Sequence, residues 1–142
     1  KDLLNDIYND VLQVFDKGAS CAYIESIYQR YSMELVEVLQ IYEWEILGEQ
    51  LIKISKGSLR KKQSFLCLVN RQANLEKDVI SVLKSSPVPI TYAELGKKMW
   101  YVPLEKIKHI LVITKEIVQV APETYFYAYN FPVNQEEITE IQ

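Results

Sequence analysis

The chain of 142 residues has few of the residues that catalytic and metal sites require. It contains four glycines, and their positions form neither a Walker loop nor a glycine-rich dinucleotide-binding fingerprint. His109 is the one histidine, and the neighbouring Lys106 and Lys108 would repel a metal cation. A catalytic histidine would also need a nucleophile beside it, and Cys67 stands in an apolar run instead. We therefore expect a protein that is not an enzyme and that holds no metal and no cofactor.

Cysteine and long apolar runs are also scarce. Cys21 and Cys67 form no CxxC motif, so the sequence suggests neither a disulfide framework nor a zinc site and favours a reducing, cytoplasmic location. No apolar run approaches the roughly 18 residues that a membrane helix needs, and no signal-peptide pattern is present, so we expect no membrane partner. The chain begins at Lys1 and not at methionine, from which we expect a fragment of a longer protein or a processed product.

The chain lacks an excess of basic charge as well. Its 16 basic and 19 acidic side chains give a net charge of −3, which argues against a generally basic nucleic-acid binder but leaves room for a local basic patch. Hydrophobic residues make up 49% of the sequence, so we expect a packed core rather than disorder. The length suffices for one domain or for two small ones.

The clearest pattern of helices begins at Asn74. This residue is a good N-cap for a first helix, which the following Ser-Ser-Pro-Val-Pro run should end. Thr91 and Glu94 form a capping-box pattern at the start of a second helix. Gly96 lies inside that helix, where glycine is unfavourable, and therefore predicts close packing against a neighbour.

A third helix and a hairpin should follow. Pro103 suits the first turn of a helix over residues 104–115. The apolar positions expected to face inward are Leu104, Ile107 and Leu111. Two β-rich runs, Ile117–Val120 and Tyr125–Tyr129, then flank a four-residue link that contains proline, which predicts a β-hairpin.

Three of these features together resemble bacterial winged helix-turn-helix domains. They are the Ala-Glu-Leu-Gly core at residues 93–96, the third helix that opens with Pro103, and the strand pattern V-x-V-x-P-x-T-Y-x-x-A over residues 118–128. The resemblance covers residues 74–130 and reaches the superfamily, not one family within it. It implies that the third helix enters the major groove of DNA and that a wing around Glu123-Thr124 approaches the duplex.

The first half shows the same order of three helices and a hairpin, without clear sequence identity to the second half. The predicted helices follow Asp2, Ser20 and Ser32, with Gly18 ending the first and Gly48 ending the third. The predicted strands are Leu51–Ser55 and Ser64–Val69, joined by a turn at residues 56–58. Residues 41–47 alternate between apolar and acidic side chains, so a strand is the alternative there.

These patterns predict a mainly α fold with small β-hairpins, an α+β class built from tandem winged-helix-like units. We expect a helical, winged-helix-like domain over residues 1–73, a winged-helix domain over residues 74–130 and an acidic tail over residues 131–142. The link between the two domains is short and polar.

Two clusters of basic residues are candidates for contact with nucleic acid. In the second half they are Lys97, Lys98, Lys106, Lys108, His109 and Lys115. In the first half they are Arg60, Lys61 and Lys62, where the charges could instead protect a strand edge from pairing with another chain. Residues 74–130 carry seven lysines against six acidic residues, a net of +1, which is compatible with DNA contact.

We therefore expect a non-catalytic winged-helix module that binds double-stranded DNA or is associated with transcription regulation, as part of a larger bacterial protein. The alternative is a module for protein interaction or homodimerisation, because the predicted third helix of the first half is acidic and surplus tyrosines could serve an interface. The acidic residues on this helix are Glu34, Glu37, Glu43 and Glu45, and Glu49 follows just after it. An accessory domain of a larger enzyme is the third possibility.

Overall fold

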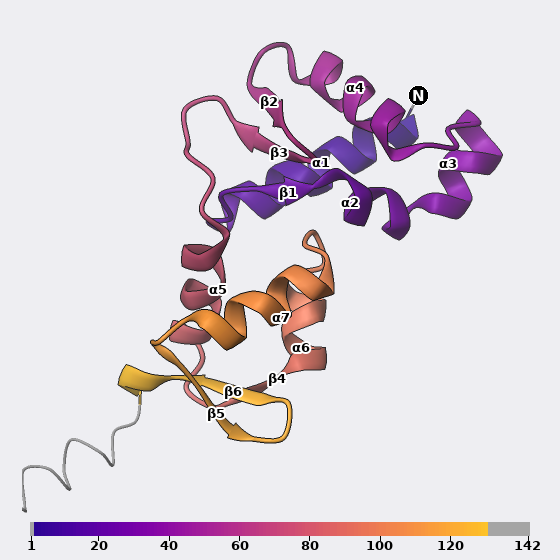
Figure 1. Cartoon of the computed structure of the whole chain (residues 1–142). Coiled ribbons are helices and arrows are strands. Elements are labelled where there is room, and N and C mark those ends of the chain that lie inside the picture. The colour runs from indigo at the N-terminus through magenta and orange to yellow at the C-terminus, as the bar shows by residue number, and fades with distance from the viewer. Residues whose placement is uncertain (1, 131–142) are drawn as a thin grey trace, which may run out of the picture. The chain divides into compact units, whose positions relative to one another are not determined.

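The computed structural model describes residues 2–130 (Figure 1). Within this part of the chain, seven α-helices and two three-stranded antiparallel sheets form an α+β fold, as the sequence predicts. The chain divides into two units. The first comprises the residues up to Leu75 together with Trp100–Pro103, and the second comprises Glu76–Met99 together with the residues from Leu104 on. The predicted acidic tail lies outside the described residues.

The first unit opens with helix α1, Asp2–Asp16, whose apolar stripe includes the buried Val11 and Phe15. Gly18 follows with a φ of +111°, a conformation that glycine adopts without steric cost. The N–H of Gly18 donates to the carbonyl of Phe15 at 3.0 Å. The first helix therefore ends where the sequence predicts, and for the predicted reason.

The second helix of this unit begins later than predicted. The chain first forms strand β1, Ala22–Tyr23, and helix α2 then spans Ile24–Arg30. Ser20 does not cap a helix; its Oγ accepts a hydrogen bond from the N–H of Asn74 at 2.7 Å. The prediction was wrong because β1 exists only through its pairing with β3, Phe65–Leu68, much later in the sequence. A local pattern does not reveal such a partner.

The third predicted helix is in fact two helices. Helix α3, Ser32–Leu39, ends at Gln40, which has a φ of +56°, and helix α4 spans Trp44–Ser55. Two predictions were therefore wrong: Gly48 does not end a helix, and residues 51–55 are helical and not a strand. Gln40 takes the left-handed conformation that glycine usually supplies, so no glycine marks the true break.

Gly48 lies in the middle of α4 because α2 packs closely against it. The Cδ1 atom of Ile24 lies 2.8 Å from the position that a Cβ on Gly48 would occupy. Leu47 and Leu51 are buried on the same helix at i, i+4 spacing. The short apolar alternation at residues 51–55 satisfies this helical spacing too, which is why it did not distinguish a strand from a helix.

The first sheet has the strand order β1-β3-β2. Strand β2, Leu59–Lys62, pairs antiparallel with β3, the strand that the sequence places at residues 64–69. Leu66 and Cys67 of β3 are buried, as expected for a core strand. The turn at residues 56–58, in which Gly57 has a φ of +95°, therefore joins α4 to β2 and does not join two strands.

The second unit shows the same element order without a counterpart of α3. Its elements are α5 (Leu75–Lys84), β4 (Ile90–Thr91), α6 (Tyr92–Lys98), α7 (Leu104–Ile113), β5 (Ile117–Ala121), β6 (Thr124–Tyr127) and the 3-10 helix η1 (Ala128–Asn130). The sheet order is β4-β6-β5, so in both sheets the first strand pairs with the third and the third pairs with the second. The 3-10 helix replaces the last residues of the predicted final strand.

Local signals in the second unit are mostly confirmed. The N–H of Thr91 donates to Glu94 Oε1 at 3.0 Å, and the N–H of Glu94 donates to Thr91 Oγ1 at 3.1 Å, which completes the predicted capping box. Close packing at Gly96 is also confirmed, because Leu104 Cδ2 lies 2.6 Å from the position of a Cβ there. Leu104 itself, predicted to face the core, is 52% exposed, and α7 ends before Lys115.

Candidate nucleic-acid interface

Helix α7 separates a buried apolar face from an exposed arc. Ile107, Ile110 and Leu111 are buried in the second unit. A helix turns by about 100° per residue, which places Lys106 and Lys108 about 160° apart, at opposite edges of the exposed arc. Both lysines are exposed. The helix therefore presents one positive charge along each margin of its outer surface.

The centre of the same arc is mixed in character. It carries Glu105, His109 and Val112, and Ile113 lies nearer to the edge that carries Lys106; all four are exposed. Val112 is 73% exposed and Ile113 is 54% exposed, which is high for apolar side chains on a helix that already has a buried face. A macromolecule that covers this arc would meet cations at its edges and a carboxylate, an imidazole and two aliphatic groups between them.

The other predicted lysines of the second half flank α7 in sequence. Lys97 and Lys98 end α6, Lys115 follows α7, and all three are exposed. The hydroxyl of Tyr92 donates to the carbonyl of Leu104 at 2.9 Å and so ties the start of α6 to the start of α7. Burial raises the pKa of Tyr92, whose phenol is protonated at neutral pH even at its ordinary pKa and can therefore donate. The structure thus brings the six predicted second-half residues to one helix pair and the segment after it.

Glu94 offsets part of the positive charge on α6. The pKa of its carboxyl is lowered, first because it accepts from the backbone N–H of Thr91 and then because of the Thr91 hydroxyl and the charges of Lys98 and Lys97. Like an ordinary glutamate, it is a carboxylate at neutral pH, so α6 carries one negative charge beside the two lysines.

The β5–β6 hairpin, the predicted wing, ends in a tight turn. Ala121 pairs with Thr124, and Glu123 between them has a φ of +55°. The carbonyl of Glu123 accepts a hydrogen bond from the N–H of Tyr92 at 2.8 Å, which ties the turn to the start of α6. Neither strand nor the turn contains a lysine or arginine. The hairpin can therefore contribute backbone and side-chain polar contacts but no positive charge.

The basic residues of the first half lie in the other unit. Arg60, Lys61 and Lys62 are exposed on β2, an edge strand of the first sheet. The Nε of Arg60 donates to Cys67 Sγ at 3.4 Å, so the Arg60 side chain lies along the sheet. A run of charges on an edge strand agrees with the alternative in which it protects that edge from pairing.

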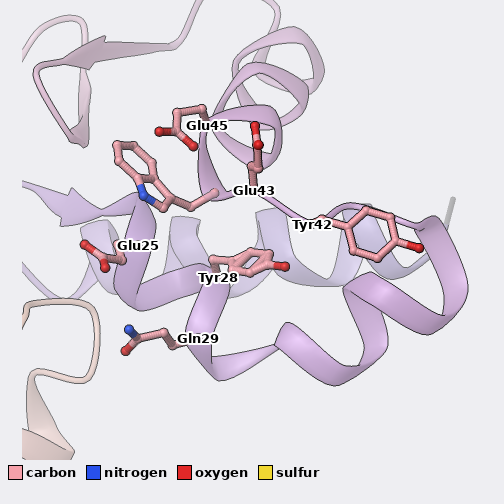
Figure 2. A pocket seen from close by; sticks show the side chains of 7 residues that line it. Glu25, Tyr28, Gln29, Tyr42, Glu43 and Glu45 are labelled. Carbon is pink, nitrogen blue, oxygen red and sulfur yellow. The ribbon is translucent and has the colours of Figure 1, made fainter.

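The first unit has a pocket that the sequence patterns did not predict (Figure 2). Helix α2 and the segment that leads into α4 line an open pocket of about 510 Å³. The lining residues are Glu25, Tyr28, Gln29, Tyr42, Glu43, Trp44 and Glu45. The alternation of aromatic and acidic residues from position 42 to 45 is the one local signal of this pocket. The side chains of α2 join it only through packing between helices, which a local pattern does not predict.

Comparison with known proteins gives no further assignment. No model of a known protein family matches the chain, and a search of curated proteins found no match. Over residues 2–130, no group of three or more histidine, cysteine, aspartate or glutamate side chains could hold a metal ion. No helix in the same part of the chain is both long and apolar enough to cross a membrane.

Proposed function

We propose that the second unit is a winged-helix domain that binds double-stranded DNA without catalysis and places α7 in the major groove. Its elements follow the order helix, strand, helix, helix, strand, strand, and β4 closes the sheet against the hairpin. The observation that carries the proposal is the placement of Lys106 and Lys108 at opposite edges of the exposed arc of α7. A role in transcription regulation within a larger bacterial protein is the broader setting that the resemblance suggests, and the scarcity of cysteine suggests a cytoplasmic location.

The geometry of the groove supports this use of α7. The major groove is about 12 Å wide and admits one helix, so the two edges of an inserted helix face the phosphates of the two strands. Lys106 and Lys108 would then each contact a different strand. Contacts with phosphates fix the position of a protein on DNA but do not read the sequence.

Residues at the centre of the arc would meet the edges of the bases. His109 can donate to a purine acceptor, Glu105 can accept from the amino group of cytosine, and Val112 can contact the methyl group of thymine. Lys97, Lys98 and Lys115 would add phosphate contacts outside the groove. This division makes the lysines responsible for affinity and salt dependence, and the central residues responsible for sequence preference.

We further propose that the first unit shares the winged-helix fold. Its sheet connects in the same order as the sheet of the second unit, and α4 occupies the position in the sequence that α7 occupies there, directly before a hairpin. The exposed surface of α4 carries Glu45 and Glu49, which phosphates would repel. The first unit is therefore not the one that we assign to DNA.

The test is a titration of a labelled mixed-sequence duplex by fluorescence anisotropy at about 50 mM and about 200 mM salt. Two phosphate contacts alone should weaken binding about tenfold between these salt concentrations. Lys106→Glu/Lys108→Glu should abolish binding at the lower salt concentration, whereas Lys17→Glu/Lys53→Glu, with the same change of charge on the first unit, should leave it nearly unchanged. Absence of binding by the unchanged protein at low salt would reject the proposal.

A protein-interaction module is the second candidate, and a different observation favours it. Val112 and Ile113 on α7, and Leu104 at its start, are all more than half exposed. Exposed apolar side chains on one helix are typical of a surface that a protein partner covers. If the protein binds no DNA, this face of α7 becomes the first surface to test for a protein partner.

A further inference from the structure

The pocket of the first unit has walls on two helices that are held close together. Glu25, Tyr28 and Gln29 come from α2, and the opposite wall comes from the segment that enters α4 (Figure 2). Gly48 permits this approach, because Ile24 of α2 lies 2.8 Å from the position of its missing Cβ. The hydroxyl of Tyr28 donates to the carbonyl of Ile41 at 2.9 Å and fixes the orientation of the ring. The pocket is therefore part of the packed fold of this unit.

The charge of the pocket selects a cation. Glu25, Glu43 and Glu45 supply three carboxylates, and among the described residues no lysine or arginine lines the pocket. Two helices, α2 and α4, also begin here, and each N-terminus contributes about half a positive charge. Three negative charges against about one positive charge leave a net of about −2. Phosphate and other anions are thus excluded.

The aromatic residues select an organic cation. Tyr28, Tyr42 and Trp44 line the cavity together with the three carboxylates. Aromatic faces attract guanidinium and ammonium groups, and a planar guanidinium also matches the geometry of a carboxylate. An open pocket of about 510 Å³ has room for an arginine or lysine side chain with part of the chain that carries it.

The surroundings of the pocket favour a cation that is attached to a polypeptide. Tyr42 in the lining segment is 67% exposed, and Ile46 directly after it is 41% exposed. A free small cation would leave these apolar groups in water, whereas a peptide segment would cover some of them.

We propose that this pocket binds the arginine or lysine side chain of a basic, partly apolar segment of another protein. The site is distinct from the arc of α7 and does not depend on DNA binding by the second unit. The cation enters between the carboxylates of the two helices and packs on the aromatic rings. The apolar neighbours of the basic residue in the partner cover the exposed side chains of Tyr42 and Ile46.

The test uses the indole N–H signals in the NMR spectrum of the isotope-labelled chain. The probe is an acetylated, amidated five-residue peptide with arginine between two leucines, and its control carries the uncharged isostere citrulline instead. The arginine peptide should shift the signal of Trp44 and bind at least about fivefold more tightly than the citrulline peptide. The signal of Trp100, which does not line the pocket, is the internal reference. Equal binding of both peptides would overturn the proposal.

Matched variants then distinguish binding in the pocket from general electrostatic attraction to the acidic surface of the first unit. Glu25→Gln/Glu43→Gln/Glu45→Gln should weaken binding of the arginine peptide about tenfold, and a change of less than about twofold would count against the pocket. The control variant changes the charge equally with exposed carboxylates outside the pocket. It is Glu34→Gln/Glu37→Gln/Glu49→Gln, and it should retain binding within about twofold. Equal losses in both variants would also overturn the proposal.

Two further outcomes would reject the assignment to a partner protein. N-acetyl-arginine amide that binds as tightly as the peptide would identify a small free cation as the occupant. Self-association that is lost in Lys61→Glu/Lys62→Glu would identify a second copy of this chain, whose basic β2 strand would enter the pocket. Sedimentation at increasing protein concentration, without peptide, detects the second case.

Discussion

The side chain of Ile24 occupies the space that a side chain on Gly48 would need. Its Cδ1 atom lies 2.8 Å, and its Cγ2 atom 3.4 Å, from the position of the missing Cβ, and Ile24 is fully buried. Gly48→Ala gains about 1 kcal/mol of helix propensity but forces a buried side chain to move, which costs about 1–3 kcal/mol. We expect a net loss of stability of about 1 kcal/mol in chemical denaturation.

A second variant, Ile24→Val, tests whether Ile24 causes the steric clash with a side chain at position 48. Ile24→Val removes the Cδ1 methyl, so Gly48→Ala should cost less in an Ile24→Val background than in the unchanged protein. A double-mutant cycle measures this coupling. If Gly48→Ala is equally destabilising in both backgrounds, Ile24 is not the cause of the requirement for glycine.

Gly96 has a shorter contact but should tolerate alanine. Leu104 Cδ2 lies 2.6 Å from the position of a Cβ on Gly96, yet Leu104 is 52% exposed and can turn toward solvent. The gain in helix propensity, about 1 kcal/mol, should therefore offset the contact. We expect the midpoint of denaturation of Gly96→Ala to equal or exceed that of the unchanged protein. A loss above about 1 kcal/mol would show that Leu104 is held in place despite its exposure.

The capping box at α6 gives a prediction for stability. Thr91 and Glu94 satisfy each other's backbone N–H groups, at 3.0 and 3.1 Å. Thr91→Ala should destabilise the protein by about 1 kcal/mol, and Thr91→Ser, which keeps the hydroxyl, should restore most of this loss. Thermal unfolding of the three proteins at neutral pH checks the order. Equal stability of the alanine and serine variants would contradict the role of the hydroxyl.

The same box predicts a dependence on pH. The pKa of Glu94 is lowered in the folded protein, chiefly by the backbone N–H of Thr91. A lowered folded pKa means that the carboxylate contributes stability above its unfolded pKa and loses that contribution as the pH falls through the folded value. The difference in stability between the unchanged protein and Glu94→Gln should therefore be constant at neutral pH and shrink below the ordinary range of a glutamate. Denaturation curves at several acidic pH values measure it.

Sequence patterns predicted the second unit better than the first, and the reason is where the structural information lies. The start of α6 is encoded within four consecutive residues by Thr91 and Glu94, and the start of α7 follows Pro103 directly. The break after α3 occurs at Gln40, which is not one of the residues that usually end a helix. Glycine is required at position 48 because Ile24 of another helix packs against it. The local signals at the starts of α6 and α7 therefore predicted the structure correctly, whereas the boundaries that packing sets in the first unit were predicted wrongly.

The exposed arc of α7 and the pocket of the first unit differ in the same way. The exposed arc of α7 follows from helical spacing within one element, so the sequence placed Lys106, Lys108 and His109 together correctly on that helix. The pocket needs Glu25 from α2 and Glu43 from the start of α4 at the same place. Their proximity depends on the packing of the two helices, and no single stretch of the chain encodes it.

The last prediction separates the lysines of α7 from the residues between them. Each phosphate contact contributes about −0.9 to the slope of log K against log salt concentration. Lys106→Ala and Lys108→Ala should each reduce the magnitude of this slope by about 1 and weaken binding to all duplexes alike. His109→Ala should leave the slope unchanged and alter only the preference among sequences, because it would act on bases. Anisotropy titrations over a range of salt concentrations with two unrelated duplexes measure both effects. An unchanged slope in both lysine variants would remove α7 from the DNA interface, even if the protein binds DNA through another surface.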